Sequence, residues 1–333
     1  MSFAATLIRA CLLCGLLMSA ACADKAASRQ SVKIVVGFEA GGAMDTLARA
    51  FATRLSAQLQ RPVYVENRVG AGGAIAANYV AKSRPDGNTL LLASPAEIFI
   101  NPVYTRSRES GEVAGMVPVA KVSSAPIVLA TRGDSAIHQL SDIAVAAQKN
   151  ARGLSFASSG IGSLQHLVGE SLGEALRVEL LHVPYGGAAS ATASLMGKQV
   201  DLLFAGLAPI ASHLQSQKMH ALGIASAHRS KRFPDIPTFQ EKGLQGVSFE
   251  YWQGVFLPKG ASSELALYLS TEINKVIKDT GFVEQLENSG FEVAYKDHKQ
   301  FEPFLQAEDQ SYRSFFRKSA FYIDLMILSG AQI

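Results

Sequence analysis

The stretch VKIVVGFEAGGAMDTLARAF, residues 32–51, contains the features that decide the fold class. Residues 32–38 are apolar apart from Lys33, which is typical of a strand buried on both faces of a sheet. A glycine pair at 41–42 then predicts a turn. Apolar side chains recur every four residues after it, so a helix is expected over 44–60. The stretch is therefore interpreted as one strand–turn–helix unit.

The same unit recurs along the chain and predicts an α/β protein. Further strands are expected at 63–66, 89–93, 154–157, 178–183, 200–204 and 221–226. Strands that alternate with helices are joined by right-handed crossovers, and the sheets are therefore expected to be parallel.

Two long segments, 118–131 and 246–260, have no helical pattern and are interpreted as extended crossings between domains. Because the chain crosses twice, the first domain is expected to be discontinuous. It is predicted to comprise 31–122 plus 253–333, around an inserted second domain at 123–252.

Local signals predict where two of the helices begin. Ser141 is placed to cap a helix over 141–150, since serine side chains accept hydrogen bonds from the first turn. The last helix is expected to begin near Pro303, because proline is tolerated in the first helical turn.

The first 23 residues predict an export signal peptide and hence a periplasmic protein. Arg9 is their only charge, an apolar run follows, and Ala21–Cys22–Ala23 resembles a cleavage site. A lipid anchor at Cys22 is the alternative. All three cysteines lie within this segment, so neither disulfides nor thiolate chemistry are expected in the rest of the chain.

Composition and motifs exclude several function classes. The net charge of +3 is too small to predict nucleic-acid binding, and no basic stripe interleaved with aromatic residues is present. The glycine-rich turns match neither a phosphate loop nor a dinucleotide fingerprint, and His213 and His220 lack a third metal ligand. No cofactor or metal is therefore predicted. A serine of the turn at 157–163 with His166 or His182 and Asp201 is left open as a hydrolase triad.

Four predicted strand ends lead into a helix through small residues: FEAGGAMD (38–45), NRVGAGG (67–73), ASSGIGS (157–163) and VPYGG (183–187). Ligands of open α/β sheets bind beyond the carboxyl ends of the strands. A helix N-terminus offers free N–H groups and partial positive charge, and glycine lets a ligand approach the backbone closely. Two such turns from different domains are therefore expected to hold one small carboxylate.

The order of these motifs resembles the tripartite tricarboxylate transporter substrate-binding proteins, the Bug receptors. The resemblance spans roughly 31–320 and rests on VVGFEAGGAMDTLAR, VYVENRVGAGGAIAANYVAKSRPDGNTLLLAS, FASSGIGSLQHLVGE, HVPYGGAASATASLMGKQVDLLF and FPDIPTFQEKG. It implies a type II periplasmic-binding-protein fold, with two α/β domains, a two-strand hinge and a central cleft that closes like a Venus flytrap. It also implies a monomeric receptor without catalysis, which passes a small carboxylate to integral-membrane permease subunits. A receptor for a membrane signalling partner is left as an alternative.

The resemblance also implies the binding residues. In that family one carboxylate of the ligand is held by the loop after the first strand and by the loop that opens the second domain. The implied ligand contacts are Phe38, Gly41, Gly42, Ala43, Asp45, Ser94, Ser158, Ser159, Ile161, Gly162, Ser163, Tyr185 and Ala205.

This chain departs from the family pattern at both ends of the expected site. Many members have prolines where it has Gly37, Glu39 and Ala40. Glu39 is an acid beside an expected anion site, so it either points to solvent or selects a ligand with a cation or hydroxyl at its far end. Ala205 and Gly206 replace a pair that is often acidic, so the distal end of the ligand is not predicted.

Overall fold

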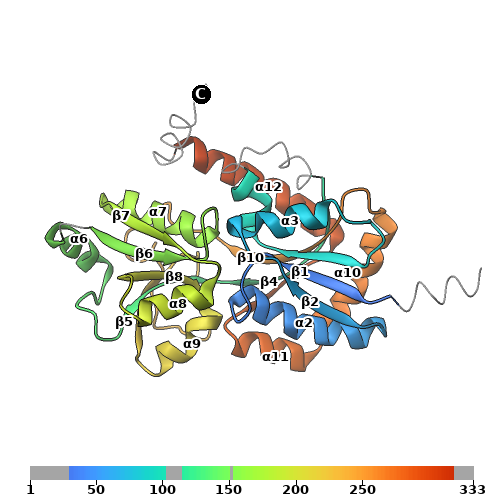
Figure 1. The fold of residues 1–333 in the computed structure, drawn as a ribbon, viewed down its shortest axis with the longest axis horizontal. Coiled ribbons are helices and arrows are strands. Elements are labelled where there is room, and N and C mark those ends of the chain that lie inside the picture. The colour runs from blue at the N-terminus through green and yellow to red at the C-terminus, as the bar shows by residue number, and fades with distance from the viewer. Residues whose placement is uncertain (1–29, 103–114, 151–152, 319–333) are drawn as a thin grey trace, which may run out of the picture.

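The computed structural model describes residues 30–102, 115–150 and 153–318. These residues form two β-sheets with flanking helices, which lie side by side as two lobes (Figure 1). No helix in the described ranges is both long and apolar enough to cross a bilayer. The predicted signal peptide at 1–23 and the alternative anchor at Cys22 lie outside the described residues.

The first lobe is built on a six-stranded sheet in the order β11-β4-β10-β3-β1-β2. Its strands are β1 (Val32–Val36), β2 (Val63–Asn67), β3 (Thr89–Ala93), β4 (Val117–Ala125), β10 (Tyr251–Leu257) and β11 (Glu292–Lys296). Its helices are α2 (Ala43–Leu59), α3 (Ala74–Ala81), α10 (Ser263–Ile277), α11 (Thr280–Asn288) and α12 (His298–Lys318), with short turns η1 (Ala71–Gly73) and η2 (Ala96–Ile100).

The second lobe is built on a five-stranded sheet in the order β7-β6-β8-β5-β9. Its strands are β5 (Ile127–Arg132), β6 (Leu154–Ser158), β7 (Leu180–Pro184), β8 (Leu202–Gly206) and β9 (Met219–Ile224). Its helices are α6 (Leu140–Lys149), α7 (Leu164–Leu176), α8 (Ala188–Met196) and α9 (Leu207–Gln215).

The expectation of parallel sheets is correct only for the strands that belong to strand–turn–helix units. β1 pairs in parallel with β2 and β3, and β6 pairs in parallel with β7 and β8. β10 runs antiparallel to β3 and β4, β11 antiparallel to β4, and β5 antiparallel to β8 and β9. Both sheets are therefore mixed, because β10 and β11 run opposite to the other strands of the first sheet, and β5 runs opposite to the other strands of the second.

The chain changes sheets at Pro126. β4 ends at Ala125 in the first sheet and β5 begins at Ile127 in the second. Proline has no N–H to donate to a ladder, so a change of sheet at this position costs no strand hydrogen bond. The chain returns through β10, so the boundaries predicted at 122/123 and 252/253 fall inside β4 and β10.

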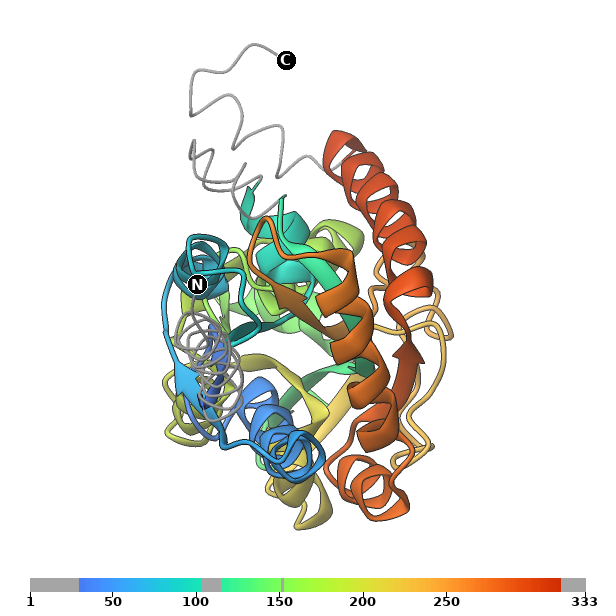
Figure 2. The same cartoon turned by 90° about the vertical axis from the view of Figure 1, so that its right-hand side faces the viewer.

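The return strand β10 is anchored in the first lobe through Trp252. The indole of Trp252 is fully buried, and its ring centroid lies 5.7 Å from that of Phe301 on α12. Its Nε1 donates a hydrogen bond of 3.0 Å to Glu308 Oε2 on the same helix. Figure 2 shows α12 running along one side of the molecule.

Two helix starts differ from the predictions. α6 begins at Leu140 and is capped by Gln139 in a capping box with Asp142, so Ser141 lies inside the helix. α12 begins at His298, and Pro303 lies within it. The signal for this earlier start was the pair Asp297 and Gln300: Gln300 N donates to Asp297 Oδ1 (2.9 Å) and Asp297 N to Gln300 Oε1 (3.3 Å).

Candidate functional site

A cavity of about 230 Å³ lies between the two lobes, at the carboxyl ends of the parallel strands. The first lobe supplies the end of β1 and the turn before α3, and the second supplies the ends of β6 and β7. Its lining residues are Gly37, Gly70, Ala71, Gly72, Ser159, Gly160, Ile161, Pro184, Tyr185 and Gly186. None of these carries a charged side chain, so any charge on a ligand must be met by backbone dipoles and by the hydroxyl groups of Ser159 and Tyr185.

Besides α3, whose N-cap is Gly73, three helices that begin close to one another between the lobes start with a glycine N-cap and have no side-chain cap from that residue. They are α2, α8 and α9, whose N-caps are Gly42, Gly187 and Gly206. Their starts converge across the lobes: a Cβ on Gly206 would lie 3.2 Å from Ala43 Cβ, and one on Gly42 would lie 3.8 Å from Ala188 N. Uncapped helix starts present orphan N–H groups and partial positive charge, which favours an anion.

The turn at 158–163 is held largely by its own hydrogen bonds. Gly160 N donates to Ser158 Oγ (3.1 Å), Gly162 N to His166 Nδ1 (3.3 Å) and Ser163 N to Gly160 O (3.1 Å). Ser163 also caps α7 by accepting from His166 N. Within the described residues, this leaves the amides of Ser159 and Ile161 as the donors of this turn available to a ligand.

Ser158 is buried and bonded to a histidine. Its Oγ lies 2.6 Å from His182 Nε2, and the ring of His182 stacks on that of His166 with centroids 3.9 Å apart. Burial, and secondly the neighbouring His166, lower the pKa of His182 to about 3. His182 is therefore neutral at physiological pH, and Ser158 serves the packing of the second lobe.

A Ser158–His182 pair is the first half of the hydrolase triad left open by the sequence. The third member, Asp201, lies elsewhere: its Oδ2 accepts from Ser155 N (2.9 Å) and Ser155 Oγ (2.8 Å). Ser158 is 0% exposed, so its hydroxyl has no path to a substrate. The geometry thus disfavours nucleophilic catalysis by this serine.

The loop after β1 is shaped by Asp45. Its carboxylate accepts from Gly41 N (2.9 Å), Arg49 Nε (2.8 Å) and Asn67 Nδ2 (3.0 Å). Burial alone would raise the pKa of Asp45, but these hydrogen bonds and the Arg49 charge outweigh it and hold the pKa below its usual value. Asp45 therefore positions the loop, and Gly41 N is already bonded.

Glu39 does not simply point to solvent, the first alternative drawn from the sequence, and the second, selection of the ligand's far end, stays a prediction. It is half-buried and turned toward the second lobe, where Ser190 N on α8 donates to Glu39 Oε2 (3.4 Å). Its own N–H donates to Gly186 O (3.4 Å). Glu39 thus links the lobes next to the cavity.

Sequence reasoning missed Glu97, which lies on η2. Its Oε2 accepts from Ser94 N (2.9 Å) and Ser94 Oγ (2.6 Å), while its buried Oε1 has no hydrogen-bond partner among the described residues. The carboxyl packs against Gly73, where a Cβ would lie 2.7 Å from Oε1. Burial raises the pKa of Glu97 to about 7, although the hydrogen bonds from Ser94 oppose the shift. No local signal distinguishes it from an exposed glutamate.

The expected ligand contacts take different positions in the structure. Ser159, Ile161 and Tyr185 line the cavity. Gly41, Gly42 and Ala43 form the start of α2, and Gly162 lies within the second-lobe turn. The remaining expected contacts are buried, and the polar ones among them are hydrogen-bonded to other residues of the protein: Phe38, Asp45, Ser94, Ser158, Ser163 and Ala205. Gly37 lines the cavity and lies outside the predicted turns. The remaining lining residues belong to the predicted turns but were not named as contacts: Gly70, Ala71, Gly72, Gly160, Pro184 and Gly186.

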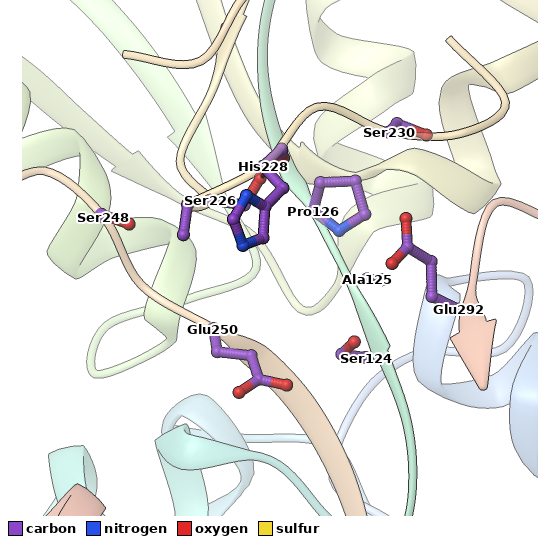
Figure 3. Close-up of a pocket in the computed structure, with 10 residues that line it drawn as sticks. Ser124, Ala125, Pro126, Ser226, His228, Ser230, Ser248, Glu250 and Glu292 are labelled. Atoms are coloured by element: carbon purple, nitrogen blue, oxygen red, sulfur yellow. Dashed lines mark hydrogen bonds between the residues drawn. The ribbon is translucent and has the colours of Figure 1, made fainter. Parts of the chain in front are cut away.

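A second cavity of about 380 Å³ lies at the hinge, away from the ends of β1, β6 and β7 that line the first cavity (Figure 3). Ser124 and Pro126 of the crossing line it together with His228, Glu250 and Glu292. Glu250 forms an ion pair with the buried Lys121. Among the described residues, no group of three metal-ligating side chains occurs there or elsewhere.

Comparison with known proteins identifies the family. The profile of the tripartite tricarboxylate transporter family receptor matches residues 47–319. The chain belongs to this family. A relative from Bordetella bronchiseptica, described as a UPF0065 protein, is 31% identical over 310 residues, which cover 93% of this chain and 91% of the relative.

Solved structures support the same assignment and the two-lobed fold. The periplasmic binding protein BugD is 32% identical with a TM-score of 0.81, covering 87% of this chain and 97% of BugD. A protein of R. palustris solved with adipate is 27% identical with a TM-score of 0.82 over 87% and 97% of the two chains. MatC of Rhodopseudomonas palustris, solved with malate, is 27% identical with a TM-score of 0.79 over 86% and 98%. The expected family and fold class are thus confirmed.

Proposed function

We propose that this chain is an exported receptor that captures a small organic carboxylate between its lobes and delivers it to the permease subunits of a tripartite transporter. The observation that carries the proposal is the convergence of two uncapped helix starts, α2 from the first lobe and α9 from the second. An anion placed there meets partial positive charge from both sides.

The backbone can supply enough binding energy for such a role. Hydrogen bonds to a charged group contribute about 1.5–3 kcal/mol each. Four or five of them, reduced by the cost of ordering and of closing the lobes, can leave the roughly −8 kcal/mol of a micromolar ligand. Since the donors come from both lobes, a bound carboxylate favours the closed state over an open one.

Family relatives support a carboxylate as the ligand class. MatC was solved with malate and the second R. palustris protein with adipate, and both share this fold over most of the chain. We infer a periplasmic location by analogy with the periplasmic binding protein BugD. The signal pattern of residues 1–23 favours processing by signal peptidase, with a lipid anchor at Cys22 as the alternative, and we also propose a monomer. A permease or a sensor kinase encoded beside the gene distinguishes a transport role from a signalling role.

We also propose that the chain has no enzymatic activity. The support is the burial of Ser158 and the engagement of Asp201 by Ser155. A serine-reactive phosphonate is therefore expected to leave the protein unlabelled. Stoichiometric labelling of Ser158 would contradict this part of the proposal.

Thermal unfolding in the presence of mono-, di- and tricarboxylates tests the proposal. A ligand that binds only the native state raises Tm with concentration. We expect at least one small carboxylate to raise Tm, while the matched primary amide, which has the same shape without the charge, does not. No rise with any carboxylate, or an equal rise with the amide, would contradict anion capture.

A further inference from the structure

Glu39 places an acidic group of the first lobe against the start of a second-lobe helix. Ser190 N, in the first turn of α8, donates to Glu39 Oε2 over 3.4 Å. The backbone end of Glu39 also packs against the α8 start: a Cβ on Gly187, the N-cap of α8, would lie 2.9 Å from Glu39 Cβ. Carboxylates are favoured at helix N-termini, where free N–H groups and the helix dipole meet them.

This position borders the cavity between the lobes. Gly186 lines the cavity and packs against the Glu39 carboxylate, so closely that a Cβ on Gly186 would overlap Glu39 Oε1. The α8 start is therefore occupied by an acid that the protein itself supplies. A carboxylate of a ligand could bond Ser190 N only by displacing Glu39.

The rest of the cavity offers nothing to a second negative charge. Its described lining residues include no lysine, arginine or histidine, and its volume of about 230 Å³ lies below the range typical of drug-sized ligands. One carboxylate can be met by the N–H groups of Ser159 and Ile161, which line the cavity and have no backbone acceptor among the described residues. A second one would lie unpaired and close to the Glu39 charge in a partly dehydrated site, where like charges repel strongly.

We propose that the ligand is a small monocarboxylate with an uncharged remainder, and that Glu39 excludes a second carboxylate by occupying the start of α8. This inference rests on the proposed function and specifies its ligand class. It separates this chain from the relatives solved with malate and adipate, which are dicarboxylates.

The experiment is calorimetric titration of three linear six-carbon acids: hexanoate, adipate and 6-aminohexanoate. The three acids have the same number of carbon atoms and differ only in the group at the end far from the shared carboxylate. For the natural chain we expect hexanoate to bind at least tenfold more tightly than adipate, and 6-aminohexanoate to have no advantage over hexanoate. This comparison requires no variant and therefore does not depend on the folding of one.

The variant Glu39→Gln keeps the shape and the hydrogen-bond acceptor of the side chain and removes its charge. We expect it to bind adipate at least tenfold more tightly than the natural chain does, with hexanoate affinity changed less than threefold. Glu284→Gln, an exposed change on α11 with the same loss of charge, is expected to leave all affinities unchanged.

Each remaining outcome has a definite meaning. Adipate binding as tightly as hexanoate to the natural chain, or unaltered discrimination in Glu39→Gln, overturns the inference and leaves carboxylate capture intact. Preference for 6-aminohexanoate by tenfold or more also overturns it, because Glu39 would then recognise a cation. Binding of no carboxylate at all, including the shorter acids of the thermal screen, overturns the proposed function itself.

Discussion

Gly72 of the first lobe lies directly against Ile161 of the second. A Cβ on Gly72 would overlap the carbonyl oxygen of Ile161 and lie 2.9 Å from the carbonyl carbon of Gly162. The backbone of Gly72 has a φ of +57°, which side-chain-bearing residues rarely adopt. The closed arrangement of the lobes therefore requires a residue without a side chain at this position.

Gly72→Ala is expected to prevent full closure and to weaken carboxylate binding at least tenfold. The new methyl group meets backbone atoms of the opposite lobe, which cannot move aside without opening the cleft. Gly243→Ala is the matched control, because Gly243 also has positive φ (+83°) but has no atom within 4 Å of its Cβ position. Both variants are expected to lose stability through backbone strain, and only Gly72→Ala to lose affinity by calorimetry. Equal affinity in the two would show that the lobes need not close at Gly72.

Two adjacent serines are predicted to have separate roles. Ser158→Ala removes the partner of the half-buried His182 ring, so we expect it to lower the free energy of unfolding by about 1–3 kcal/mol. Ser159 lines the cavity, and Ser159→Ala is expected to weaken ligand binding with little effect on stability. Urea unfolding and calorimetry on both single variants measure the two effects. The opposite distribution, with affinity lost only in Ser158→Ala, would place the ligand against Ser158.

Glu97 is expected to make the protein less stable as pH rises. The folded protein keeps its proton up to about pH 7, whereas the unfolded chain releases it near 4.5. Between these values the folded state binds more protons, so the free energy of unfolding falls with rising pH, by up to about 3 kcal/mol. Glu97→Gln is expected to abolish this decline and to be more stable than the natural chain at pH 8. Urea unfolding at pH 5 and pH 8 measures it, with exposed Glu264→Gln as control. An unchanged slope in Glu97→Gln would show that Glu97 is ionised or solvated.

His182 has the opposite effect on stability. Its folded pKa of about 3 lies below its ordinary value of 6.5, so the unfolded state binds more protons between these two values. Stability from this residue is complete above pH 6.5 and is lost as pH falls toward 3. In Glu97→Gln, urea unfolding is expected to show a free energy of unfolding that decreases as pH falls below 6.5. The double variant Glu97→Gln/His182→Gln is expected to show a smaller decrease.

Asp45 is predicted to be a positioning residue for the loop after β1. Asp45→Ala removes the acceptor of Gly41 N and is expected to weaken carboxylate binding about tenfold, because the loop loses its fixed shape. Arg49→Met removes one partner of the buried Asp45 carboxylate and leaves the hydrogen bonds from Gly41 N and Asn67 Nδ2 in place. That control is expected to bind normally. Full affinity in Asp45→Ala would contradict the role.

The local pattern of the sequence was sufficient for the strand–turn–helix units. The apolar run at 32–38 and the four-residue spacing after it predicted β1 and α2 nearly to their ends. The same reasoning did not predict that the crossing strands β5 and β10 pair antiparallel to their neighbours, because nothing local reveals the direction in which they enter a sheet. The start of α12 was predictable from Asp297 and Gln300, had the capping-box rule been applied in place of Pro303.

The candidate site was predictable as a set of turns and not as a set of contacts. Sequence pointed to the ends of β1, β6 and β7, but it could not show that Ser158 faces His182 while Ser159 faces the cavity. Nor could it place Glu39 at the start of α8, since the two are brought together only by the approach of the lobes. Contacts between distant segments depend on tertiary packing, which no local rule describes.

A crystal structure with a carboxylate bound at saturating concentration tests the central claim most directly. We predict the carboxylate between the lobes, within hydrogen-bond distance of backbone N–H groups from both the start of α2 and the second-lobe turn or the start of α9. A carboxylate found in the hinge cavity beside Glu250, or held by one lobe alone, would contradict the account.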